Sequence, residues 1–147
     1  METESTGASI EGSYELVARE LPDGSRLEPP DVFGFMSFTA GHRLFHIYTP
    51  APEGGGDAHT AYTRVSAYRL TETEYSETLK YEVTDDAGEA SGPTYRFSGS
   101  LGPAPVTVSD RGIQFRDIPE GPILASTSAG LTATDEGEFV DHWVKVR

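Results

Sequence analysis

The chain has 147 residues, which is the usual length of one domain built around a single hydrophobic core. Its formal net charge of -13 argues against nucleic acid or an anionic membrane as a partner, because both require clustered basic side chains and the 11 Lys and Arg residues here are scattered. The absence of cysteine excludes disulfides, thiolate metal sites and a thiol nucleophile.

Residues 1–9 are polar and offer little to bury, so we expect a disordered N-terminal tail followed by a single domain at residues 10–147. The tail lacks the basic and apolar regions of a signal peptide, and no apolar run approaches the about 18 residues that a membrane helix needs. We therefore expect a cytoplasmic protein. We interpret the acidic composition as favouring solubility, with an acidic docking face as the alternative.

The stretch from residue 11 to residue 50 predicts three antiparallel strands, at 12–20, 32–39 and 43–49. Apolar residues alternate at period two, and Asp23-Gly24 and Ala40-Gly41 supply the turns. The second strand is apolar in both registers, so we expect it to be covered on both faces or to contain a bulge. On the first strand the even-numbered face is expected to point inward, with Tyr14, Leu16 and Ala18.

The segment 50–59 contains three consecutive glycines and two prolines, which predicts a loop. It could act as a lid over a ligand or be a plain flexible connection. Pro103 and Pro105 are expected to interrupt strand pairing, and 85–92 to form an acidic turn. The remaining expected strands are 61–70, 75–83, 95–101, 106–109, 113–117, 123–134 and 138–147.

Eight to ten short strands without a convincing amphipathic helix predict an all-β fold with consecutive antiparallel pairing. An open sheet of this size would expose two edges, and the chain has few lysines to protect them. We therefore expect an up-and-down closed β-barrel with little or no helix.

Three short motifs resemble the lipocalin-like domains of bacterial and fungal proteins. They are Gly12-Ser13-Tyr14-Glu15-Leu16-Val17, the run from Gly34 to Leu44 with its Thr39-Ala40-Gly41-His42 turn, and the closing Trp143-Val144-Lys145-Val146-Arg147. This resemblance implies a calycin-like barrel with one open end and an internal cavity. Tyr14 stands where that family usually has tryptophan, so its hydroxyl would need a buried partner. The family includes carriers, hydrolases, isomerases and cyclases, and therefore implies no single activity.

Glu77 is the most distinctive candidate for chemistry, because it lies between Tyr75 and Leu79 on an apolar strand face. Burial there would raise the pKa of Glu77 and suit it to proton transfer. The alternatives are an ion pair with Arg64 or a position near the rim in water. His46 and His142 are the other catalytic candidates, and each could instead be a hydrogen-bonded residue of the barrel wall.

Tyrosines and other aromatic residues are frequent on the strands, and a cavity lined with them would suit an oxygenated apolar ligand. The alternative is that they are simply favoured in strands. No histidine spacing predicts a metal site, and we expect no cofactor. The residues that we expect to bind a ligand are Tyr14, Phe35, Tyr48, Tyr62, Arg64, Tyr68, Tyr81, Tyr95, Phe97 and Trp143.

These features favour a cofactor-independent isomerase or cyclase acting on a hydrophobic polyketide- or terpenoid-like small molecule inside the barrel. The first alternative is a carrier or sequestering protein for such a ligand. The second is an interaction module with a filled core. A homodimer is possible and would be favoured by an uncovered first or last strand.

Overall fold

The computed structural model describes residues 10–50, 59–86, 92–110, 112–116, 118 and 121–146. The expected tail at 1–9, most of the 50–59 loop and most of the 85–92 turn lie outside these ranges. The strands are β1 (Gly12–Glu20), β2 (Arg26–Leu27), β3 (Phe33–Thr39), β4 (His42–Pro50), β5 (His59–Leu70), β6 (Glu74–Asp86), β7 (Thr94–Arg96), β8 (Gly99–Ser109), β9 (Gly112–Arg116), β10 (Ile123–Ser126), β11 (Gly130–Asp135) and β12 (Phe139–Val146).

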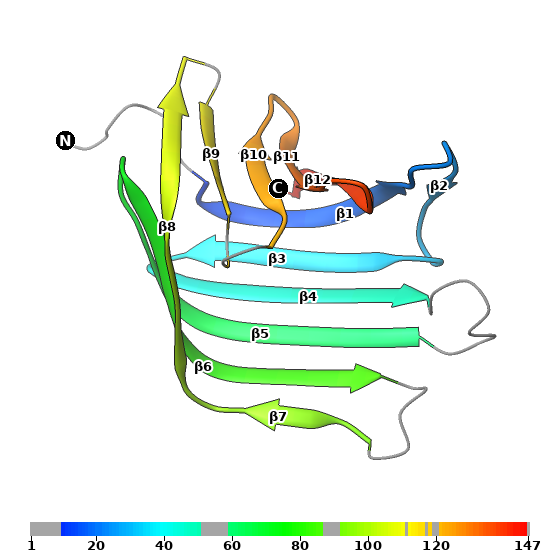
Figure 1. Ribbon diagram of the computed structural model, residues 1–147, viewed down its shortest axis with the longest axis horizontal. Coiled ribbons are helices and arrows are strands. Elements are labelled where there is room, and N and C mark those ends of the chain that lie inside the picture. Colours follow the sequence, from blue (N-terminus) through cyan, green and yellow to red (C-terminus); the bar gives the residue numbers. More distant parts are fainter. Residues whose placement is uncertain are drawn as a thin grey trace.

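The strands form a closed antiparallel barrel, which confirms the predicted fold class (Figure 1). Neighbouring strands follow the order β12-β11-β10-β9-β8-β6-β5-β4-β3-β1, and β1 pairs with β12 to close the ring. The short strands β2 and β7 pair with β1 and β6 outside this ring. No helix is assigned in the described residues, and none of them forms a segment that could cross a membrane as a helix.

One half of the barrel interior is filled by aromatic and aliphatic side chains. Tyr14, Phe38 and Tyr75 are at most 3% exposed, and the ring of Phe38 makes edge contacts with Tyr14 and Tyr68. The Tyr14 hydroxyl donates a 2.7 Å hydrogen bond to the Ile10 carbonyl, which supplies the buried partner that this residue was expected to need. This end of the barrel is therefore closed by packing.

Two bulges decide which side chains point inward. β6 shifts its register against β5 after Leu79, so Glu82 turns inward, and Tyr81, expected inside, packs outside against Tyr95. β1 shifts against β12 between Leu16 and Ala18, which brings Arg19 opposite Asp141 rather than outward as expected. A single extra residue reverses every face that follows it, so the predicted inner faces hold only up to each bulge.

Two further expectations are wrong in detail. β8 continues through Pro103 and Pro105, because Gly102 and Pro103 bulge opposite β6 and residues 102–105 do not pair with β9. The stretch expected as one strand at 123–134 is two strands, β10 and β11, joined by a turn in which the Thr127 amide donates to the Gly130 carbonyl.

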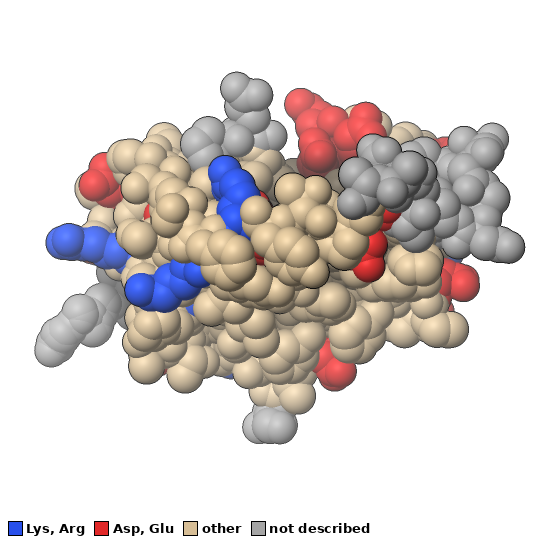
Figure 2. All heavy atoms as spheres, turned by 90° about the horizontal axis from the view of Figure 1, so that it is seen from below, with Lys and Arg blue, Asp and Glu red and all other residues tan. Residues whose placement is uncertain are grey.

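The outside of the barrel also carries aromatic residues. Phe33, Tyr95 and Phe97 are 44%, 53% and 66% exposed. β3 was expected to be covered on both faces or bulged, but its pairing with β4 is regular from Phe33 to Thr39. Seen from the side of β7, uncharged residues make up most of the visible surface, and separate charged side chains lie among and around them (Figure 2).

Gly34 lies on the inner face of β3 against the indole ring of Trp143. A Cβ atom at this position would collide with the Cη2 and Cζ3 atoms of that ring. We expect Gly34→Ala to lower the free energy of unfolding by about 1–3 kcal/mol, as overpacked cores do. Urea denaturation measures this change, and Ser37→Ala on the same strand is the matched control. A Gly34→Ala protein as stable as the wild type would contradict this packing.

Candidate functional site

A cavity of about 330 Å³ lies inside the barrel beside the aromatic core, and Met36, Leu124, Ala133 and Trp143 belong to both. Its wall is mostly apolar, and its polar members are Tyr62, Arg64, Arg19 and Asp141. This composition is typical of a site for a small apolar molecule with few polar groups. The other lining residues are Met36, Phe45, Ile47, Ile118, Pro122, Leu124, Ala133, Phe139 and Trp143.

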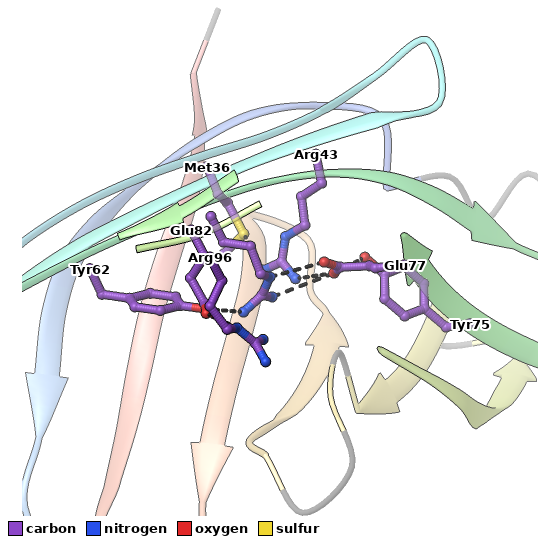
Figure 3. A network of polar contacts seen from close by, with 8 residues as sticks. Met36, Arg43, Tyr62, Tyr75, Glu77, Glu82 and Arg96 are labelled. Atoms are coloured by element: carbon purple, nitrogen blue, oxygen red, sulfur yellow. Dashed lines mark hydrogen bonds and ion pairs between the residues drawn. The ribbon is translucent and has the colours of Figure 1, made fainter. Parts of the chain in front are cut away.

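Glu77 lies behind the cavity wall, where two arginines and a tyrosine hold its carboxylate (Figure 3). Arg43 donates to Oε2 at 2.9 Å, and Arg64 donates through Nε to Oε1 at 2.9 Å. The Tyr75 hydroxyl donates to Oε2 at 2.5 Å. The side chains of Arg43, Arg64 and Glu77 are only 1%, 3% and 0% exposed, so the cluster is fully enclosed.

The environment of Glu77 makes it an unsuitable proton donor near neutral pH. Burial by itself raises the pKa of Glu77, but the charges of Arg43 and Arg64 and the hydrogen bond from Tyr75 outweigh it and lower the pKa to about 2. The expectation of a raised pKa is therefore wrong, and the alternative of an ion pair with Arg64 is confirmed. The second arginine, Arg43, was not anticipated.

Arg64 connects this cluster to the cavity. Its Nη1 group donates a 3.0 Å hydrogen bond to the Tyr62 hydroxyl, which in turn donates to Glu82. Glu82 also accepts a hydrogen bond from Arg96 at 2.7 Å. Burial raises the pKa of Tyr62 to about 12, so its hydroxyl stays protonated. The polar wall on β5 is thus fixed from behind by ion pairs.

A second polar pair lies across the cavity, where β1 meets β12. Arg19 donates from Nε and Nη2 to the two carboxylate oxygens of Asp141, at 2.7 and 2.9 Å. The Arg19 guanidinium also stacks on Phe139, 3.8 Å from the ring centre. Asp141 is 2% exposed, and burial raises the pKa of this carboxyl although Arg19 opposes the shift. Among the described residues that line the cavity, Asp141 is the acidic one.

The two candidate catalytic histidines do not line the cavity. The ring of His46 contacts Phe33 on the outside of β3 and β4, and its Nδ1 lies 2.7 Å from the Thr63 hydroxyl. His142 lies 2.7 Å from Glu20 on the outer side of β12. Their arrangement corresponds to hydrogen-bonded residues of the barrel wall, and the structure brings neither of them to Glu77.

The expected ligand-binding residues separate into three groups. Tyr62, Arg64 and Trp143 line the cavity. Tyr14 and Tyr68 belong to the packed closed end. The other five lie on the outside of the barrel, where strand alternation or a bulge places them, and they are Phe35, Tyr48, Tyr81, Tyr95 and Phe97.

Sequence reasoning missed Arg43, Arg19 and Asp141. Arg43 shares its strand register with Phe45 and Ile47, and Asp141 lies midway between Phe139 and Trp143 at period two. A charged residue in an apolar register was the signal that singled out Glu77, and it would have found Arg43 and Asp141 as well. Arg19 carries no such signal, because a bulge turns it inward.

Comparison with protein-family models, curated proteins and solved structures finds no match to this chain. Within the part of the chain that the structure describes, no three His, Asp or Glu side chains lie close enough to share a metal ion. The proposed function below is therefore based on the geometry of the cavity.

The pH dependence of stability tests the Glu77 cluster. The pKa of Glu77 is lowered from 4.5 to about 2. The contribution of Glu77 to stability is therefore fully present above pH 4.5 and is lost as the pH falls toward 2. We expect Glu77→Gln to cost about 3–5 kcal/mol at neutral pH, because two buried arginines lose their partner. The difference from wild type should shrink below pH 4.5 in urea denaturation.

Two variants support that comparison. Tyr75→Phe keeps the packing and removes one hydrogen bond to a charged group, so it should cost about 1.5–3 kcal/mol even if Glu77→Gln does not fold. Glu28→Gln removes an ion pair with Arg26 in which the side chains are 60% and 50% exposed, and it should change little. Parallel pH profiles for wild type and both cluster variants would contradict the assignment.

Proposed function

We propose that this chain is a lipocalin-like barrel that binds a small hydrophobic molecule carrying at least one polar group, as a carrier or sequestering protein. The observation that carries this proposal is the cavity of about 330 Å³, with its mostly apolar wall. A volume in this range suits a small molecule, and the apolar wall supplies the driving force for its transfer from water. The closed antiparallel barrel is compatible with the resemblance to lipocalin-like domains.

The polar groups of the wall define how such a ligand would be oriented. Tyr62 and Arg64 lie on β5, and Arg19 and Asp141 lie across the cavity on β1 and β12. A ligand carbonyl, hydroxyl or ether group would find hydrogen-bond donors at Arg64 on one side of the cavity and at Arg19 on the other. The wall between these two sides is apolar and would contact the hydrophobic part of the ligand. Because ion pairs hold these side chains in place, little side-chain entropy would be lost on binding.

A specific observation also favours catalysis as a second candidate function. Asp141 is a carboxyl with a raised pKa in the cavity wall, which is the property expected earlier of Glu77. In a cofactor-independent isomerase or cyclase, Asp141 would take a proton from one carbon of a polyketide- or terpenoid-like substrate and return it to another. Tyr62 and Arg64 would polarise the adjacent carbonyl, and no other reactant is required.

Trp143 provides a direct test of binding, because it is the single tryptophan of the chain and lines the cavity. We expect the neutral dye Nile red to gain fluorescence with the protein and to change the Trp143 emission. Ala133→Leu would fill part of the cavity and weaken this binding at least about tenfold, or about 1.4 kcal/mol.

Ala129→Leu, at an exposed turn position, is the matched control for that substitution. It should bind the dye as the wild type does. Equal dye binding by Ala133→Leu and the wild type, or an unchanged Trp143 emission with bound dye, would contradict binding in the cavity.

The catalytic candidate has a separate test. With a panel of hydrophobic oxo-polyenes monitored by NMR, we expect Asp141→Asn to slow any conversion by about 100-fold or more while Nile red still binds. His142→Ala, the neighbouring residue on the outer side, should convert the substrate at the wild-type rate. Binding without conversion by the wild type would leave the carrier as the function, and conversion that survives Asp141→Asn would exclude Asp141 as the catalyst.

A further inference from the structure

The outer surface of strands β3 to β7 carries two adjacent cross-strand rows without charged residues, and we call these rows, with Phe33 and Phe97 beside them, the outer aromatic face. The row of Phe33, Tyr48 and Ala61 ends at Asp85 on β6, which lies at the margin of the face. One cross-strand row of this face begins at Phe35 on β3 and ends at Tyr95 on β7, passing through His46, Thr63 and Val83. The adjacent row consists of Ser37, Leu44, Val65 and Tyr81. No Asp, Glu, Lys or Arg occupies either row, although the chain as a whole has 24 acidic residues.

Several residues of this face are strongly exposed. Phe33, Leu44, Tyr95 and Phe97 are 44%, 36%, 53% and 66% exposed, and Tyr81 packs against Tyr95 and Phe97 without covering them. Monomeric proteins seldom leave a contiguous apolar surface of this kind open to water unless it is used in binding. The outer aromatic face is therefore a candidate interface rather than ordinary surface.

The exposed aromatic residues of the face supply a large part of the area that a specific contact needs. The three most exposed aromatic residues alone present about 300 Å² of surface, taking about 200 Å² for a whole aromatic side chain. The half-buried residues of the two rows add to this area, and a specific interface at the lower end of the known range buries about 600 Å² per copy.

The charge distribution indicates which partner fits. Two copies of a chain with a net charge of -13 repel each other wherever acidic side chains meet. The outer aromatic face is a surface on which they can approach without placing carboxylates in contact, and uncharged residues also dominate the view from the β7 side (Figure 2). Desolvation there involves no buried charge.

We propose that the outer aromatic face is the interface of a homodimer, in which two copies pack face to face around a two-fold axis. An isologous contact uses the same patch on both chains, which two adjacent rows without charged groups permit. A dimer formed by edge-to-edge pairing of the first and last barrel strands is excluded, because β1 and β12 already pair with each other. The dimer does not depend on the proposed ligand function.

Sedimentation velocity of the full chain tests this proposal. We expect the wild type to form a dimer of twice the 15.9 kDa chain mass. Leu44→Asp and Phe97→Asp should each weaken the dimer at least about tenfold, because each places a carboxylate in the apolar contact. Phe97 is 66% exposed, so its substitution leaves the packing of the monomer intact.

Val144→Asp is the matched control, because Val144 lies on β12 outside the face. The exposed fraction of Val144 is 38%, which is similar to the 36% of Leu44. It should dimerise as the wild type does. A monomeric wild type at all concentrations would overturn the proposal, as would a dimer that resists both Leu44→Asp and Phe97→Asp. Weakening by Val144→Asp to the same extent would also overturn it, because the effect would then be one of added charge alone.

Discussion

The buried cluster of Glu77 with Arg43 and Arg64 is the interaction on which the interior of the barrel depends. It joins three adjacent strands, β4, β5 and β6, at the boundary between the packed end and the cavity. Charged groups this deep are costly to desolvate, and the arrangement is tolerated because each carboxylate oxygen accepts hydrogen bonds from charged or hydroxyl donors. The same bonds fix Arg64 against Tyr62 and so set the polar wall of the cavity.

This arrangement separates a structural carboxylate from one that could act on a ligand. Glu77 is held ionised and enclosed, with a pKa lowered to about 2. Asp141 has a single described arginine partner, a raised pKa and a position in the cavity wall. Two acidic residues in equivalent sequence contexts therefore differ in chemistry because of how many cations the fold places beside them.

The fold class and most strand positions followed from the period-two pattern, because an antiparallel barrel alternates between a buried and an exposed face. The face assignments failed where one extra residue enters a strand: after Leu79 for Tyr81, and around Val17 for Arg19. The sequence does not mark these bulges. Phe35 and Tyr95 were expected among the ligand-binding residues, but regular strand alternation, without a bulge, places both on the outside of the barrel.

The proposed function requires that a ligand enter the barrel and contact its inner wall rather than the outer aromatic face. Intermolecular nuclear Overhauser effects between Nile red and protein methyl groups test it most directly. We expect contacts from the dye to the methyl groups of Met36, Leu124 and Ala133, which line the cavity. Contacts to Leu44 and Val65 on the outer aromatic face, with none to the cavity methyl groups, would contradict it.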